Sequence, residues 1–157
     1  MSAVIQTYID TPVGQLNIVT DDQRVQSISF VMLDSFISSQ ETSVITEQAS
    51  QQLTSYFRQA HTNWSLPLLI KGTDFQCKVW RYLQTIPIGE TRTYLDVAEA
   101  LTTSARAVAN ACRANSFSIV IPCHRVISRS GLGGYYGKTA GQELAIKQWL
   151  LDHERRG

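Results

Sequence analysis

The pattern of the chain changes at Lys71-Gly72, and this change limits the folds open to it. Before that point, three short segments alternate between apolar and polar residues and are separated by polar turns; they are residues 3–9, 15–20 and 25–31. Such alternation is typical of strands, so it predicts an antiparallel meander. After that point, the start signals of short helices replace it. We therefore expect two domains, over residues 1–70 and 71–157.

The first domain also carries a helical pattern. Apolar side chains recur at four-residue steps, at Ile45, Ala49, Leu53 and Phe57. This spacing predicts one amphipathic helix with these side chains on its buried face. Residues 65–70 then indicate a further short strand. A sheet accompanied by a helix places the first domain in the α/β class.

The second domain begins with two helices whose starts are marked by capping residues. Thr73 and Thr93 are each followed three residues later by a side chain that can bond back to the helix start. The polar turn at residues 102–104 leads into a third helix, over residues 105–115. Two short helices with a tight turn between them predict a helix-turn-helix.

The third helix presents polar and cationic side chains on one face. Arg106, Asn110 and Arg113 share that face at i, i+4 and i+7 spacing, and several other positions hold alanine, including Ala107. Small side chains let a helix approach a nucleic-acid groove closely, whereas long ones hold it away. The same pattern also fits a solvated surface helix with two arginines.

Charge is distributed unevenly along the chain. The net charge of +1 conceals 2 basic against 6 acidic residues up to Ile70, and 12 basic against 7 acidic residues after it. No acidic residue lies between Glu99 and Glu143, a span that also holds Arg125 and five cationic residues in all. This imbalance favours a surface of the second domain that faces a polyanion.

The sequence has no pattern of a secreted, membrane or metal-binding protein. Its N-terminus lacks the basic flank and apolar core of a signal peptide, and no apolar run is long enough to span a membrane. We therefore expect a cytoplasmic protein. The histidines are scattered, and the odd number of cysteines has no CxxC spacing, so neither a disulfide framework nor a metal site is expected. The cysteines are Cys77, Cys112 and Cys123.

The remaining segments fit a winged-helix domain. An apolar run over residues 118–121, ended by Pro122, predicts a buried strand from which Cys123 emerges. Residues 126–137 have the glycine-rich pattern of a hairpin or wing, and apolar spacing over residues 144–153 predicts a closing helix. The second domain is therefore expected to be of α+β class.

Cys123, His124 and Arg125 have the composition of an activated thiol. A thiol attacks as its thiolate, and a neighbouring imidazole and positive charge lower its pKa towards neutrality. Neighbours in an extended segment point to opposite faces, so contact between Cys123 and His124 needs a local turn or a bridging water. A buried structural cysteine fits the composition equally well.

The hexapeptide Ile121-Pro122-Cys123-His124-Arg125-Val126 is very similar to the active-site motif of the O6-alkylguanine-DNA alkyltransferases, the methylated-DNA–protein-cysteine methyltransferases. The resemblance covers residues 72 to 154 and continues through further motifs in family order. These are Gly72-Thr73-x-Phe75-Gln76-x-x-Val79-Trp80, Ile86-Pro87-x-Gly89-x-Thr91, Thr93-Tyr94, Arg106-Ala107-Val108, Asn115, Tyr136-Gly137 and Lys147-x-Trp149-Leu150-Leu151-x-x-Glu154.

This resemblance implies stoichiometric DNA repair. Cys123 would accept a methyl or other alkyl group from O6 of guanine, or O4 of thymine, after the base flips out of the duplex. His124 would act as general base through a water, and Glu154 would orient it. Asn115 would hold the turn beneath the acceptor. The substrate pocket would consist of Cys123, Val126, Tyr136 and Gly137.

The resemblance also implies a set of DNA contacts in the minor groove. Tyr94 would donate to the leaving guanine and crowd the target phosphate, and Arg106 would fill the vacated stack. By their position on the third helix, rather than by the resemblance, Ala107 and Asn110 would line the groove with it. Charge and position alone predict that three further residues contact phosphates. Each of these residues fits an ordinary surface cation equally well. They are Arg113, Arg129 and Lys138.

We therefore expect an RNase-H-like α/β domain followed by a winged-helix domain, acting as a monomer on double-stranded DNA without a cofactor. A non-catalytic winged-helix lesion sensor is the first alternative, and a Cys–His hydrolase is the second. Family relatives that only sense lesions lack the acceptor cysteine, so Cys123 disfavours the sensor. A Cys–His hydrolase has no need for a helix in a segment without acidic residues, so this segment disfavours the hydrolase.

Overall fold

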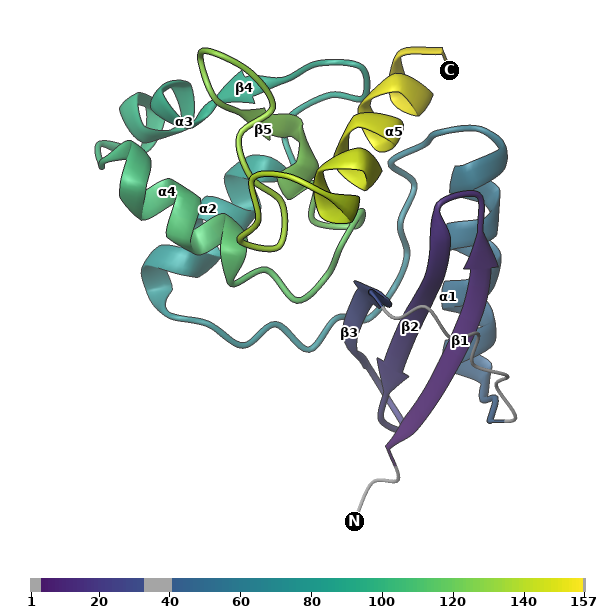
Figure 1. Cartoon of the computed structure of the whole chain (residues 1–157). Coiled ribbons are helices and arrows are strands. Elements are labelled where there is room, and N and C mark those ends of the chain that lie inside the picture. Colours follow the sequence, from purple (N-terminus) through teal and green to yellow (C-terminus); the bar gives the residue numbers. More distant parts are fainter. Residues whose placement is uncertain (1–3, 33–40, 157) are drawn as a thin grey trace. The chain divides into compact units, whose positions relative to one another are not determined.

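The computed structural model of the chain describes residues 4–32 and 41–156 (Figure 1). The chain divides into two compact units, Met1–Lys71 and Gly72–Gly157. Among the helices of the described ranges, none is both long and apolar enough to cross a membrane.

The first unit contains an antiparallel sheet. Its strands β1 (Ile5–Thr11), β2 (Gly14–Thr20) and β3 (Val25–Phe30) pair in the order β1-β2-β3, so the predicted meander is confirmed. Gly14 closes the β1–β2 turn with a φ of +118°, a conformation that glycine adopts at little cost. Alternate side chains of β2 are buried, namely Leu16, Ile18 and Thr20.

One helix, α1 (Val44–Arg58), packs on all three strands. Its buried side chains are Thr46, Ala49, Leu53 and Tyr56. The predicted stripe was therefore correct at Ala49 and Leu53 but wrong at both ends, because steps of four residues drift around a helix of 3.6 residues per turn.

The strand predicted over residues 65–70 is wrong in extent. Only Leu68 forms a bridge, a parallel one with Val25 of β3. The Val25 N–H donates to the Pro67 carbonyl at 2.7 Å, and the Leu69 N–H donates to the Val25 carbonyl at 2.8 Å. Pro67 has no N–H of its own to extend the ladder.

The second unit starts with three helices, α2 (Asp74–Leu83), α3 (Tyr94–Leu101) and α4 (Ala105–Arg113). Both predicted capping boxes form, at Thr73 and Thr93. Helices α3 and α4 pack against each other across a three-residue turn. α4 ends two residues earlier than predicted.

Trp80 of α2 fixes the end of α4. Its indole Nε1–H donates to the Ala111 carbonyl at 2.8 Å inside the core. That carbonyl lies in the last turn of α4, where no helical N–H is available to it. Gly72 makes room for the indole, because a Cβ there would lie 2.6 Å from two of its ring atoms. α2 therefore holds the end of α4 in place.

The rest of the second unit is built on a short parallel pair, β4 (Arg92–Thr93) and β5 (Val126–Ile127). Thr93 pairs with Ile127 and also caps α3, so the start of α3 is fixed beside β5. β5 directly follows the 3₁₀ helix η1 (Cys123–Arg125), which α5 (Gln142–Arg156) contacts. The predicted closing helix is confirmed but runs three residues further than expected.

Candidate active site

The segment before Cys123 forms a turn, so the buried strand predicted there was wrong. Ile119 has a φ of +74°, which no strand accommodates. The Asn115 side chain organises the turn: its Nδ2 donates to the Ile121 carbonyl at 2.8 Å, and its Oδ1 accepts from the Phe117 N–H at 2.9 Å. The apolar side chains of the turn are buried in the core, which explains why their composition imitates a strand.

Cys123 begins η1, and the two residues after it turn into the core. Both contact Glu154 near the end of α5. His124 Nε2 lies 2.7 Å from Glu154 Oε2, while Arg125 donates from Nε to Oε1 at 2.8 Å and from Nη2 to Oε2 at 3.0 Å. The predicted pairing of His124 with Glu154 is therefore present, with Arg125 as an additional member.

Arg125 does not belong to a polyanion-facing surface, as its place in the acid-free span suggested. Its residue is 2% exposed, and its third donor group, Nη1, bonds to the Ile86 carbonyl at 2.8 Å. A guanidinium with all these bonds satisfied inside the protein has no free face for a phosphate. Charge counting along the sequence cannot distinguish such a buried cation from an exposed one.

Glu154 is a carboxylate, and His124 is neutral near pH 7. Burial alone would raise the pKa of Glu154, but His124 and Arg125 outweigh it and hold that pKa well below its usual range. Burial lowers the pKa of His124, against the opposing effect of Glu154. A neutral ring that donates through Nε2 leaves Nδ1 as its basic atom. His124 Nδ1 is buried without a hydrogen-bond partner in residues 4–32 and 41–156.

Acidification is expected to destabilise the protein from about pH 6.5 downward, by up to ~1.4 kcal/mol per pH unit. The folded pKa of His124 lies below its unfolded value, so the unfolded chain binds a proton that the folded protein does not. Urea midpoints between pH 7.5 and pH ~5 measure this slope. His153→Gln should keep it and His124→Gln should remove it; an unchanged slope in His124→Gln would contradict the assignment.

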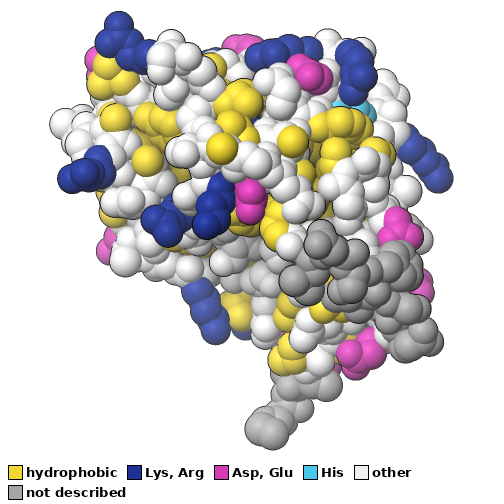
Figure 2. Space-filling view, in the orientation of Figure 1, with side chains coloured by type: hydrophobic (Ala, Val, Ile, Leu, Met, Phe, Trp, Pro, Cys, Tyr) yellow, Lys and Arg dark blue, Asp and Glu magenta, His cyan; other side chains and the backbone are white. Residues whose placement is uncertain are grey.

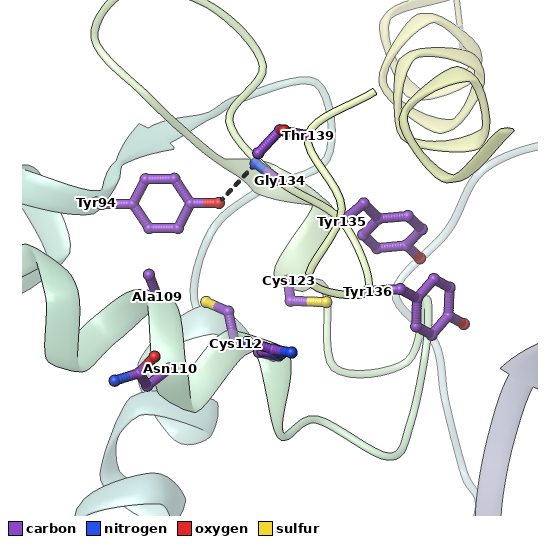
Figure 3. Close-up of a pocket in the computed structure, with 11 residues that line it drawn as sticks. Tyr94, Ala109, Asn110, Cys112, Cys123, Gly134, Tyr135, Tyr136 and Thr139 are labelled. Carbon is purple, nitrogen blue, oxygen red and sulfur yellow. Dashed lines mark hydrogen bonds between the residues drawn. The ribbon is translucent and has the colours of Figure 1, made fainter. Parts of the chain in front are cut away.

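Cys123 opens onto a cavity of about 260 Å³ (Figure 3). Its walls come from α4, η1 and the loop over residues 134–139, together with the first residue of α3. Its size is slightly below that of drug-sized ligand sites. The lining residues are Tyr94, Ala109, Asn110, Cys112, Arg113, Cys123, Gly134, Tyr135, Tyr136, Gly137 and Thr139.

The Cys123 thiol is protonated at rest. The sequence predicts that His124 and Arg125 lower its pKa, but both side chains turn inward, and this expectation was wrong. Burial raises the pKa of Cys123, with a hydrogen bond from Asn115 and the charge of Lys147 acting in the opposite direction. A reaction at this sulfur therefore needs a group that takes its proton.

Sequence reasoning missed Lys147, a fully buried residue of α5. Its Nζ donates to three carbonyls, those of Val126 at 2.6 Å, Leu132 at 2.6 Å and Gly134 at 2.9 Å. The Nζ also lies 5.8 Å from the centre of the Tyr94 ring. Burial lowers the pKa of Lys147 to about 8. The sequence signals for this role were a lysine among the apolar positions of the closing helix and its place in the motif that ends at Glu154.

The cavity loop packs closely against two predicted DNA contacts. Gly134 N–H donates a long hydrogen bond of 3.4 Å to the Tyr94 hydroxyl (dashed line in Figure 3). A Cβ at Gly133 would lie 2.8 Å from the Tyr94 ring, and a Cβ at Gly137 would lie 2.7 Å from Arg113 Nε. Both glycines have a positive φ, so side chains are disfavoured there on two grounds. Burial raises the pKa of Tyr94 to about 12.

The structure brings six of the predicted site residues to the cavity; they are Tyr94, Asn110, Arg113, Cys123, Tyr136 and Gly137. Asn115, His124 and Glu154 lie behind it. Val126, predicted as a pocket residue, is not part of the lining, and its carbonyl accepts a hydrogen bond from Lys147. Its contact with substrate stays a prediction.

The other predicted DNA contacts lie on the surface. Arg106 is exposed on α4 with Ala107 beside it, and Arg129 and Lys138 are exposed beyond β5. Most Lys and Arg side chains visible in Figure 2 lie on the Gly72–Gly157 unit. Their contact with DNA stays a prediction.

Two family models match the chain, one after the other. Residues 4–70 match the ribonuclease-like domain of 6-O-methylguanine DNA methyltransferase, and residues 74–156 match its DNA binding domain. The chain belongs to the 6-O-methylguanine DNA methyltransferase family. The resemblance inferred from the Ile121–Val126 motif is thereby confirmed.

Relatives match this methyltransferase chain over nearly its whole length. A protein of Acanthamoeba polyphaga mimivirus, named a probable methylated-DNA–protein-cysteine methyltransferase, is 41% identical over 152 residues, which are 94% of this chain and 95% of that one. The constitutive methylated-DNA–protein-cysteine methyltransferase of Bacillus subtilis is 40% identical over 160 residues, 95% of this chain and 94% of that one.

A solved structure of the family also matches. It is the crystal structure of Mycobacterium tuberculosis OGT in complex with DNA, which is 35% identical to this methyltransferase chain, has a TM-score of 0.80, and aligns with 95% of this chain and 91% of that one. At the level of a ribonuclease-like domain followed by a DNA-binding domain, the predicted fold class is confirmed.

Proposed function

We propose that this protein repairs double-stranded DNA by transferring a methyl or other alkyl group from O6 of guanine, and from O4 of thymine, to Cys123. The observation that carries the proposal is a protonated thiol on a cavity, next in sequence to a buried neutral histidine held by a carboxylate. The names of the relatives describe the transfer of a methyl group from methylated DNA to a protein cysteine. The thioether product has a poor leaving group, so each molecule acts once. In this proposal the protein acts as a monomer.

The transfer is an in-line displacement at the alkyl carbon. The bond from Cys123 Sγ to carbon forms while the bond from carbon to O6 breaks, and the thiol proton passes through a water to His124 Nδ1. Glu154 keeps the His124 ring in the tautomer that leaves Nδ1 basic. Tyr94, protonated because its pKa is about 12, donates to the leaving guanine. No metal or organic cofactor takes part.

The DNA is bound through a helix-turn-helix formed by α3 and α4, with the turn at residues 128–131 as the wing. An alkyl group at O6 is out of reach inside the stacked duplex, so the guanine must leave the stack, which costs a few kcal/mol. α4 enters the minor groove with its small side chains, including Ala107, and Arg106 takes the place of the flipped base. Asn110 faces the groove, and Arg113 and Arg129 contact phosphates.

The proposal is tested by the intact mass of the protein after incubation with a duplex that contains one O6-methylguanine. We expect the mass of one methyl group in place of one hydrogen, mapped to Cys123 by peptide analysis. Cys123→Ser should gain no methyl group, and Cys77→Ser, which changes a thiol outside the cavity, should gain one. Repeated turnover, or a folded protein without an adduct, would overturn the proposal and, in the second case, favour a lesion sensor.

Replacing Arg106 by alanine is expected to slow repair of duplex DNA by roughly 10–100-fold, because the vacated stack loses its filler and unstacking is no longer compensated. Reaction with free O6-benzylguanine needs no flipping and should change little. Arg81→Ala, which removes an exposed arginine of α2, serves as the control for lost charge. Equal slowing of both substrates by Arg106→Ala would argue against this role.

A further inference from the structure

One wall of the cavity is a tyrosine in an unusual backbone conformation. Tyr136 and Gly137 line the cavity and are the two central residues of a tight turn. The flanking residues, Tyr135 and Lys138, exchange two backbone hydrogen bonds, of 2.9 and 3.0 Å. The φ angle is +53° at Tyr136 and +73° at Gly137. Glycine adopts such values freely, whereas a tyrosine there is strained and persists only where surrounding contacts hold it.

A buried serine holds the Tyr136 side chain. The hydroxyl groups of Ser118 and Tyr136 share a hydrogen bond, in which either oxygen can donate. Ser118 is 2% exposed, so water has little access to this bond. The Tyr136 ring also packs against the Tyr135 ring, with 4.7 Å between the ring centres. Because a tyrosine side chain has only two torsions, a bond at its tip and a contact along its ring fix its orientation.

Ser118 is a firm anchor because it belongs to the turn that precedes Cys123. The Ile121 N–H donates to the Phe117 carbonyl at 3.0 Å, and the Asn115 side chain bonds to the backbone of both residues. The Cys123 N–H in turn donates to the Ile121 carbonyl at 2.8 Å. The same turn therefore positions the acceptor cysteine and, through Ser118, the tyrosine wall of the cavity.

We propose that the Ser118–Tyr136 hydrogen bond limits the size of the alkyl group that reaches Cys123. In Figure 3 the Cys123 sulfur points towards the Tyr136 side of the cavity, and the Tyr136 hydroxyl points away from that sulfur. A bulky substituent on the reacting carbon therefore meets the tyrosine ring. As a limit on alkyl transfer the proposal rests on the proposed function, whereas the limit on access to the sulfur does not.

The size of the effect follows from the strength of one hydrogen bond. A methyl group fits without moving Tyr136, whereas a benzyl group displaces the ring and breaks its bond to Ser118. A hydrogen bond between neutral partners in a protein changes an equilibrium by roughly 2–10-fold. The bond therefore disfavours the benzyl group against the methyl group by about this factor. Ser118 acts only through Tyr136, so it is a positioning residue.

The test compares two duplexes that differ only in the alkyl group, O6-methylguanine and O6-benzylguanine. For each variant the benzyl-transfer rate is divided by the methyl-transfer rate, so effects of a substitution on DNA binding cancel. Ser118→Ala and Tyr136→Phe should each raise this ratio roughly 2–10-fold. Ser116→Ala, which changes an exposed serine of the same segment, should leave it unchanged. An unchanged or lowered ratio in Ser118→Ala would overturn the proposal.

A double variant distinguishes one shared bond from two separate effects on the cavity. Combining Ser118→Ala with Tyr136→Phe should give the same ratio as either single variant, because both substitutions remove the same hydrogen bond. A uniform loss of packing would lower both transfer rates and leave their ratio unchanged. A ratio near the product of the two single effects would show that the residues act independently, which contradicts the proposal.

A second measurement uses no DNA and does not depend on the proposed function. Iodoacetamide and N-benzyliodoacetamide each form a carbon–sulfur bond with Cys123 while iodide leaves and the thiol proton passes to solvent. Peptide masses give the rate at Cys123 separately from the other cysteines. The ratio of the benzyl to the unsubstituted reagent should rise roughly 2–10-fold in Ser118→Ala and stay unchanged in Ser116→Ala.

The two measurements separate the two proposals. If the reagent ratio rises in Ser118→Ala but no variant transfers a methyl group from DNA, the proposed function fails and the size limit at Cys123 stands. If methyl transfer occurs but neither ratio rises, the size limit fails and the proposed function stands. A reagent ratio that stays flat in Ser118→Ala overturns the size limit whether or not methyl transfer occurs.

Discussion

Replacing Glu154 by glutamine is expected to lower the free energy of unfolding by about 3–5 kcal/mol, the cost of leaving a buried charge without its partner. Glutamine keeps the shape of the side chain but removes the charge that Arg125 contacts through two nitrogens. The Arg125 side chain is 2% exposed and the Glu154 side chain 1% exposed, so water cannot replace the lost interaction. Urea unfolding at pH 7 measures the change.

The same variant is expected to slow methyl transfer by about 100-fold, because His124 loses the acceptor that fixes its tautomer. Asp152→Asn is the matched control: it lies on the same helix, is exposed, and makes two surface interactions, a 3.8 Å ion pair with Arg155 and a 2.9 Å hydrogen bond from Gln148. It should change stability by no more than about 0.5 kcal/mol. A loss below about 1 kcal/mol in Glu154→Gln would show that the buried pair is not essential to the fold.

Replacing Lys147 by methionine is expected to cost about 3 kcal/mol of stability. Methionine has a similar length, but it donates no hydrogen bond, so the Val126, Leu132 and Gly134 carbonyls each lose a donor. An unsatisfied buried acceptor costs about 1–3 kcal/mol. Part of the gross loss is recovered because an ammonium no longer has to be buried.

Lys147→Met should also move methyl transfer to higher pH, because the lysine charge lowers the pKa of Cys123. The rate measured as a function of pH distinguishes this effect from simple unfolding. Lys78→Met provides the control, as it removes an exposed lysine of α2 that does not line the cavity. If both variants gave the same stability and the same pH profile, Lys147 would have no electrostatic role at the cavity.

The elements that could be predicted from sequence are those whose cause is local. Both capping boxes at Thr73 and Thr93 formed, and the alternating segments formed the meander. The wrong predictions concern segments whose conformation is determined by tertiary contacts. Residues 119–121 are apolar and β-branched, yet two hydrogen bonds of the Asn115 side chain, one donated and one accepted, hold the segment in a turn. A side-chain bond across six residues leaves no periodic trace in a sequence.

The candidate site shows the same division. Cys123 on a cavity and His124 against Glu154 followed from the motif, because the family carries both. The roles of Arg125 and Lys147 did not follow, since each was counted as a charge or helix residue without knowledge of its burial. Cys112, for which the sequence predicted no role, also lines the cavity. Burial of a polar group is decided by partners distant in sequence, here 13 to 39 residues away.

The contact between His124 and Glu154 joins residues 30 positions apart. Protein synthesis adds about 5–20 residues per second, so a growing chain holds its acceptor thiol for a few seconds before the last turn of α5 exists. During that interval His124 has no carboxylate to fix its tautomer, and the thiol keeps its proton. The proposed alkyl transfer therefore depends on a carboxylate that is synthesised only after the acceptor cysteine.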